Sequence, residues 1–197
     1  DKRIARFNAL KLKYLSIFLF FSLLPLISFA QYDDLLHKPY PKNLDGYAKL
    51  YLELIDLKDT TVLKKKIAEV KAFADKNGDR ELELEMDLFD AYYHIDLRKK
   101  QVNEHLLSLK ELIITAGNEG IAHIKIRGIR VLADYYWYDL KNYELAFEQY
   151  LLMEQELDKV SEKDYPEIPR DLSKIGQAYF FFQDYGRAIK YFKKAIS

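Results

Sequence analysis

The chain has 197 residues, of which 49% are hydrophobic and 31% are charged, and it contains no cysteine. This composition is typical of a globular protein with a substantial core, and it excludes a largely disordered chain. The formal net charge is zero, and the lack of cysteine excludes both a disulfide framework and lipoprotein processing at a cysteine.

Residues 1–30 have the pattern of a secretory signal peptide. Five basic residues precede an apolar run over residues 14–27, and Ser28-Phe29-Ala30 then places small residues at the two positions that signal peptidase reads. We expect a helical leader, cleavage before Gln31, and export to the periplasm or cell envelope. An uncleaved anchor is the alternative, but the run contains Pro25 and is shorter than the roughly 20 residues that span a bilayer.

Without this leader the chain would carry 26 Lys and Arg residues and 30 Asp and Glu residues, a net charge of −4. Binding to a phosphate backbone needs a surplus of clustered positive charge. We therefore expect no nucleic-acid partner for this segment. Membrane contact is expected only through an uncleaved N-terminus or through a C-terminal part that follows.

The mature chain is predicted to be helical after a short lead-in. Residues 31–43 contain Pro39 and Pro41 and few periodic apolar residues, which predicts an extended segment. From residue 42 to residue 165 there is no proline, and apolar residues recur three and four apart. Asp59 offers an N-capping side chain, and Gly78 followed by Asp79 predicts a left-handed helix stop and then a new N-cap. These signals and the loops divide the chain into four expected helix pairs: 44–58 with 61–77, 80–98 with 102–116, 121–139 with 143–160, and 168–183 with 186–197.

Equivalent residues recur at a nearly constant spacing in these pairs. In the first helices the spacing is 43 residues (Tyr93, Tyr136, Tyr179), and in the second helices it is 43 and then 42 (Leu107, Tyr150, Phe192). A fixed period of this kind predicts a solenoid, in which each pair buries its apolar face against the next. The chain ends inside the last predicted helix, so we also expect further chain to follow.

The last pair carries the most specific pattern. Small residues stand where two helix backbones would approach each other, and aromatic residues stand beside them: Ile175, Gly176, Tyr179, Tyr185, Ala188, Phe192 and Ala195. The pattern resembles the tetratricopeptide repeat, although Leu172 stands where that family often has Trp. Residues 121–160 resemble it more loosely. The resemblance implies an all-α fold over residues 44–197, built from about four antiparallel hairpins stacked as a right-handed α-solenoid.

Patterns for catalysis or metal binding are missing from the sequence. The four histidines lack the two-histidine spacing of a helical metal site, and no His-Glu-x-x-His occurs: His37, His94, His105 and His123. The segment from Asp75 begins like a calcium loop, but Arg80 and Met86 stand where that loop needs Gly and Glu. There is also no Gly-x-Ser-x-Gly elbow and no phosphate-cradling glycine loop. We expect no catalytic residue, no metal and no cofactor.

Aromatic residues crowd two equivalent first helices, at residues 135–138 and 179–182. Four neighbours in a row point around more than half of a helix, so they cannot all be core. In proteins of the resembled family the ligand lies in a concave groove, and the resemblance places ten residues there: Arg127, Arg130, Asp134, Trp137, Tyr138, Arg170, Ser173, Gln177, Phe180 and Phe181. Arginine beside flat rings favours a peptide with an acidic or carboxylate end. Alternatively, the rings pack against an adjoining repeat or against further chain.

These features together favour a non-catalytic scaffold of the cell envelope that binds a protein or peptide. Bacterial proteins with a signal sequence and such repeats often continue into a transmembrane helix and a kinase or a DNA-binding regulator. The sensory half of a longer signalling protein is therefore one alternative. An accessory region of an enzyme, with its catalytic domain elsewhere, is the second.

Overall fold

The computed structural model describes residues 32–196, so the signal-peptide and cleavage interpretations fall outside the described residues. The chain divides into two compact units. Of the first unit, which ends at Leu36, the structure describes a single 3-10 turn, Asp33–Leu35. The second unit starts at His37 and contains eight α-helices and no strand among its described residues. The all-α prediction is confirmed, and no described helix is long and apolar enough to cross a membrane.

The first helix begins earlier than predicted. Helix α2 spans Tyr40–Ile55, with Pro39 at its N-cap and Pro41 inside its first turn. The first amides of a helix have no carbonyl partner within it, so a proline there removes no hydrogen bond. Residues 40–43, which were expected to belong to the extended lead-in, are therefore helical.

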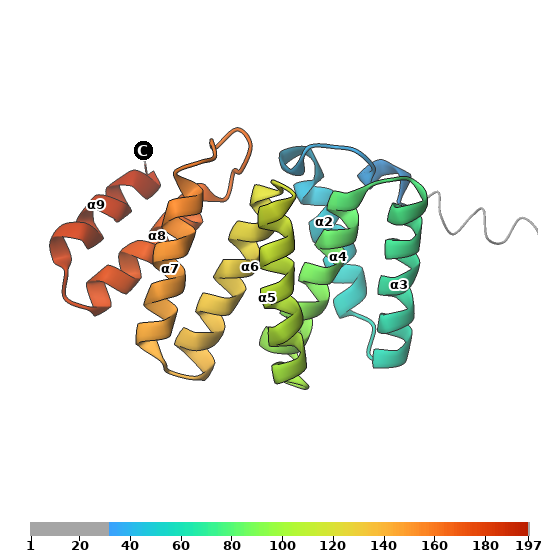
Figure 1. The fold of residues 1–197 in the computed structure, drawn as a ribbon, viewed down its shortest axis with the longest axis horizontal. Helices are drawn as coiled ribbons and strands as arrows, with labels where there is room; N and C mark the ends of the chain where they lie inside the picture. Colours follow the sequence, from blue (N-terminus) through green and yellow to red (C-terminus); the bar gives the residue numbers. More distant parts are fainter. Residues whose placement is uncertain (1–31, 197) are drawn as a thin grey trace, which may run out of the picture. The chain divides into compact units, whose positions relative to one another are not determined.

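The remaining helices follow the predicted pairs, and Figure 1 shows how they alternate in direction along the chain. Their bounds are α3 Thr60–Lys76, α4 Arg80–Tyr92, α5 Val102–Asn118, α6 Ala122–Asp134, α7 Tyr143–Leu157, α8 Ile168–Phe181 and α9 Tyr185–Ile196. The predicted caps are confirmed, because Asp59 accepts hydrogen bonds from two amides of α3 and Asp79 accepts one from α4. Gly78, just before Asp79, has the left-handed conformation that ends α3.

Two helices end in a π-helical turn that the sequence did not predict. The turns are Tyr93–Leu97 after α4 and Tyr135–Asp139 after α6. Each is closed by a bond between residues five apart, from the Arg98 amide to the Tyr93 carbonyl and from the Leu140 amide to the Tyr135 carbonyl. A π turn contains one residue more than an α turn, so the side chains after it are rotated around the helix axis.

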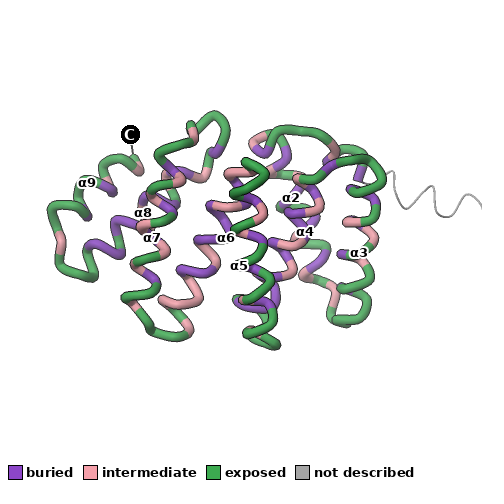
Figure 2. Tube along the Cα trace, viewed as in Figure 1, coloured by how far each residue is buried: buried purple, intermediate pink, exposed green. Residues whose placement is uncertain are grey.

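Helices packed next to each other are mostly sequential, and α8 with α9 and α6 with α7 pack most closely. Buried residues line the faces where these helices meet, as Figure 2 shows. Small residues are required at two of these contacts, because a Cβ at Gly176 would lie 2.8 Å from the Phe192 ring and one at Gly128 would lie 2.8 Å from Ile113. Helix α2 is the exception, since its backbone packs less closely on its neighbours than the other helices do.

Candidate functional site: a tyrosine-lined cavity between four helices

A partly enclosed cavity of about 420 Å³ lies beside α2. Its walls come from α2, from α4 with its π turn, from α6 with the start of its π turn, and from the beginning of α8. Five tyrosines line it, together with aliphatic side chains such as Leu44, Leu88 and Val131: Tyr40, Tyr47, Tyr51, Tyr92 and Tyr135. The looser backbone packing of α2 leaves this space, and the large rings fill only part of it.

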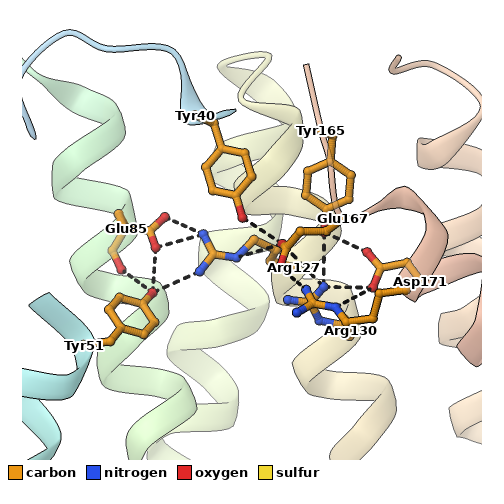
Figure 3. Close-up of polar contacts among 9 residues, drawn as sticks. Tyr40, Tyr51, Glu85, Arg127, Arg130, Tyr165, Glu167 and Asp171 are labelled. Carbon is orange, nitrogen blue, oxygen red and sulfur yellow. Dashed lines mark hydrogen bonds and ion pairs between the residues drawn. The ribbon is translucent and has the colours of Figure 1, made fainter. Parts of the chain in front are cut away.

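A buried ion pair between α4 and α6 borders the cavity, which Arg127 lines. The Arg127 guanidinium donates to both carboxylate oxygens of Glu85, at 2.8 and 2.6 Å, and Glu85 is fully buried. The Tyr51 hydroxyl donates to Glu85 at 2.7 Å and accepts from Arg127 at 3.2 Å. Burial opposes the charge on Arg127, but Glu85 holds the pKa of Arg127 well above its usual range. Figure 3 shows that this group joins three helices.

A second buried pair continues this network toward α8. Arg130 donates to Asp171 at 2.8 Å, and the Tyr165 hydroxyl donates to the other oxygen of the same carboxylate at 2.7 Å. Glu167 stands between the two pairs (Figure 3), where it accepts a hydrogen bond of 2.7 Å from Tyr40. Its carboxylate lies 3.8 Å from Arg127 and 3.7 Å from Arg130. Although burial acts in the opposite direction, Arg130 and the Tyr40 hydrogen bond lower the pKa of Glu167.

Two further carboxylates that line the cavity are Asp134 and Asp96. Asp134 accepts hydrogen bonds from the Lys174 ammonium, at 2.9 and 3.0 Å, and from the Tyr150 hydroxyl at 3.0 Å. Asp96 also lines the cavity and has no ion-pair partner among the described residues. Burial, followed by the nearby charges of Asp134 and Asp139, raises the pKa of Asp96. The nearby Lys99 and Lys174 act in the opposite direction on this pKa.

Each of the four cations that line the cavity already has a carboxylate partner in the same chain. The pairs are Arg127 with Glu85, Arg130 with Asp171, Arg170 with Glu167, and Lys174 with Asp134. Asp96 is the one lining carboxylate left over, so the cavity as a whole has a single excess negative charge. An acidic ligand would have to displace an internal carboxylate, whereas a cationic group could enter beside Asp96 without breaking a pair.

Only four of the ten predicted groove residues line this cavity: Arg127, Arg130, Asp134 and Arg170. The other six do not line it: Trp137, Tyr138, Ser173, Gln177, Phe180 and Phe181. Trp137 and Tyr138 lie inside the π turn Tyr135–Asp139, where side chains do not point in the directions that a regular α-helix would give them. The helix was predicted to run through residue 139, and the resemblance placed Trp137 and Tyr138 in one groove with Arg127 and Arg130.

Trp137 lies in a separate aromatic cluster. Its ring meets Tyr143 edge-on at 5.1 Å and Phe181 edge-on at 5.0 Å, and it also lies 5.9 Å from Tyr150. Phe181 is 48% exposed and Phe180 is 58% exposed, so this cluster has an open side. The structure thus divides the predicted groove into a charged, tyrosine-lined cavity and an aromatic cluster around Trp137.

Several residues of the cavity were missed by sequence reasoning. Tyr40 was placed in an extended lead-in, which hid the fact that Tyr40, Tyr47 and Tyr51 follow a helical spacing and share a face of α2. Glu85 and Asp171 bind the arginines of the cavity wall and were not predicted as site residues, yet both are fully buried. Their partners are about 40 residues away in sequence, so no local pattern could identify them.

Beside the cavity, His123 is buried and stacks on the Tyr40 ring, with 4.3 Å between ring centroids. Burial lowers the pKa of His123 to about 4, against an unfolded value near 6.5. The unfolded chain therefore takes up a proton as the pH falls through 6.5, while the folded chain does so only near pH 4. The free energy of unfolding should therefore fall as the pH drops from about 6.5 to about 4. Above this range His123 should not affect stability.

We expect His123 to reduce the free energy of unfolding by about 2 kcal/mol at pH 5 relative to pH 7. The measurement is urea denaturation at both pH values for the wild-type chain and for His123→Phe, which keeps a flat ring against Tyr40 and removes the titration. The wild-type chain should lose about 2 kcal/mol more than the variant. Equal losses would show that His123 does not titrate as its burial requires.

Comparison with protein-family models, with curated proteins and with solved structures gave no match for this chain. Its function is therefore inferred from the cavity, from the charges around the cavity and from the repeat pattern of the sequence.

Proposed function

We propose that this chain is a non-catalytic module that binds a peptide segment of a partner protein in the cavity beside α2. The observation that carries the proposal is a space of about 420 Å³ lined by five tyrosines and several aliphatic side chains. A volume of this size takes a few side chains, and tyrosine supplies large contact area at a low cost in conformational entropy. Apart from Asp96, the charged groups around it are bound to one another, which is typical of a preorganised wall and not of a reactive nucleophile and base.

We further interpret the four helix pairs as a right-handed α-solenoid of repeats similar to tetratricopeptide repeats. Sequential packing supports this, as do π turns at equivalent places in the second and third pairs, after α4 and after α6. The contact between Gly176 and Phe192 supports it in the last pair. In such a solenoid the first helices of the pairs line one face. Helices α4, α6 and α8 are the first helices of their pairs, and all three border the cavity.

The charge of the cavity favours a peptide with a lysine or arginine side chain. Asp96 is a lining carboxylate without an ion-pair partner among the described residues, and the Tyr92 and Tyr135 rings line the same cavity. A cation gains both from the carboxylate and from the faces of aromatic rings. The arginines alone suggested an acidic peptide. We propose a basic peptide instead, because carboxylates of the same chain neutralise those arginines.

The pattern of residues 1–30 supports placing this module in the cell envelope. The partner would then be another exported protein or an exposed segment of a membrane protein.

Filling the cavity should abolish peptide binding. Ala48 lines the cavity from α2, so Ala48→Trp places an indole in the space that the peptide would occupy. Leu52→Trp is the matched control, one turn along the same helix, at a residue that is 65% exposed and does not line the cavity. Peptides would be selected on the wild-type chain from a displayed random library, and their affinity for all three proteins would be measured by fluorescence polarisation.

We expect Ala48→Trp to weaken binding at least tenfold, about 1.4 kcal/mol, while Leu52→Trp binds like the wild type. Selected peptides should be enriched in lysine or arginine, and Asp96→Asn should reduce that enrichment. Equal affinity of Ala48→Trp and wild type, or a library that yields no binder, would contradict the proposed function. Binders without basic residues would contradict only the assignment of Asp96.

A further inference from the structure

A second cavity, of about 330 Å³, lies where the α2–α3 and α4–α5 connections meet. Four basic side chains line it, and no acidic side chain does: Lys58, Lys64, Arg98 and Lys100. None of the four forms an ion pair within the part of the chain that the structure describes. The nearest acidic residue in sequence, Asp59, accepts hydrogen bonds from the Thr61 and Val62 amides at the start of α3. Four like charges around one cavity favour the entry of an anion.

Arg98 is held in place for such a ligand. Its Nε donates to the Tyr93 hydroxyl at 2.7 Å, and its guanidinium carbon lies 5.4 Å from the centre of the Tyr93 ring. This contact fixes the plane of the guanidinium group and leaves the terminal nitrogens without a partner among the described residues. The N-cap residue of helix α5, Gln101, also lines the cavity and makes no side-chain cap hydrogen bond. The positive end of the α5 dipole adds to the field of the four basic groups.

The cavity contains one buried polar side chain, His94, which is 3% exposed. Among the residues that the structure describes, neither ring nitrogen of His94 has a hydrogen-bond partner, and an Asp90 carboxylate oxygen lies 3.7 Å away. Buried polar groups are almost always hydrogen-bonded, so an orphaned imidazole next to a cavity points to a ligand. Burial, followed by His105 and Lys64, lowers the pKa of His94. The ring is therefore neutral near pH 7 and keeps one N–H to donate.

A metal ion is the competing ligand, because Asp90, His94 and His105 each offer one ligand atom within 4.8 Å of the others. The two imidazole rings, however, are stacked face to face, with 3.9 Å between centroids and 9° between planes. A metal bound to an imidazole nitrogen at about 2 Å lies close to the plane of that ring. One metal ion cannot lie in the planes of two rings that are stacked parallel to each other. The four nearby basic groups also repel a cation. An anion therefore fits this site better than a metal.

We propose that this basic cavity binds a phosphate group, either as free inorganic phosphate or as a small phosphomonoester. Arg98 and Lys64 supply charge-assisted hydrogen bonds to the phosphate oxygens, and His94 donates its ring N–H. The volume exceeds that of a phosphate ion and leaves room for the organic part of a monoester. This site is separate from the tyrosine-lined cavity, and its ligand does not depend on the function proposed there.

The test is a titration of the ¹⁵N-labelled chain with inorganic phosphate and, separately, with glycerol 3-phosphate, at pH 7.5 and constant ionic strength. The ring signals of His94 should shift and saturate with at least one of the two ligands, and the tighter one identifies the source of the phosphate group. The double variant Lys64→Ala, Arg98→Ala should weaken binding by about tenfold or more. The double variant Lys65→Ala, Lys110→Ala, which loses the same charge at exposed residues outside the cavity, should bind within about twofold of wild type.

Three results would overturn the proposal. The first is an equal shift when sodium chloride replaces phosphate, which would indicate screening alone. The second is unchanged affinity in the Lys64→Ala, Arg98→Ala variant although its spectrum shows a folded chain. The third is that Zn²⁺ shifts the ring signals of both His94 and His105 while neither phosphate ligand shifts them, which would identify a metal site.

Discussion

Glu85→Ala should lower the free energy of unfolding by about 3 to 5 kcal/mol. Glu85 is fully buried and is the carboxylate that binds Arg127 and the Tyr51 hydroxyl. Removing it leaves the guanidinium group of Arg127, a residue that is only 9% exposed, without its counter-charge. Desolvating an unpaired charge is costly, and this sets the size of the effect. Denaturation by guanidinium chloride, monitored by helical circular dichroism, gives the change directly.

Two controls separate this buried pair from an ordinary surface pair. Glu69→Ala removes the carboxylate of the pair with Lys66 on α3, where the Glu69 side chain is 38% exposed, and it should leave the unfolding midpoint nearly unchanged. The double variant Glu85→Met, Arg127→Met removes both charges and should recover part of the loss, because an apolar pair needs no compensation. Equal midpoints for Glu85→Ala and Glu69→Ala would show that the Glu85 network does not support the cavity wall.

Trp137→Ala should destabilise the chain by about 3 kcal/mol, at the low end for truncation of a packed aromatic because the ring is partly exposed. The lost contacts are those with Tyr143, Tyr150 and Phe181. Affinity for a selected peptide should stay within about twofold of wild type, since Trp137 does not line the cavity. Thermal unfolding and fluorescence polarisation measure the two effects on one protein.

Tyr138→Ala is the neighbouring control, because Tyr138 is 51% exposed and should cost little stability. The opposite pattern would be a stable Trp137→Ala protein that has lost its peptide affinity. That result would show that the peptide binds to the aromatic cluster around Trp137 and not in the cavity.

Local signals were enough to predict the helices. Asp59 and Asp79 were identified as N-caps and Gly78 as a left-handed stop from sequence alone, and each has that role in the structure. These features depend on side chains within a few residues of the backbone groups that they satisfy, so a sequence window contains the whole interaction. The pairing of successive helices followed from the same boundaries.

The candidate site could be predicted only in part, because its interactions are long-range. Arg127 and Arg130 were singled out correctly as residues of a first helix, but their carboxylate partners Glu85 and Asp171 lie 42 and 41 residues away. The bond from Tyr40 to Glu167 spans 127 residues. No spacing rule predicts such pairs, and neither π turn has a sequence signal comparable to a cap. The charge of the cavity, and hence its ligand, therefore required the structure.

The most direct test of peptide binding is an isotope-filtered NOE spectrum of the labelled chain bound to one selected, unlabelled peptide. Protons of the peptide should show NOEs to the methyl groups of Leu44 and Val131 and to the ring of Tyr92, which line the cavity from three different helices. NOEs confined to the rings of Trp137 and Phe181, with none to those three residues, would place the peptide on the aromatic cluster and contradict the proposed site.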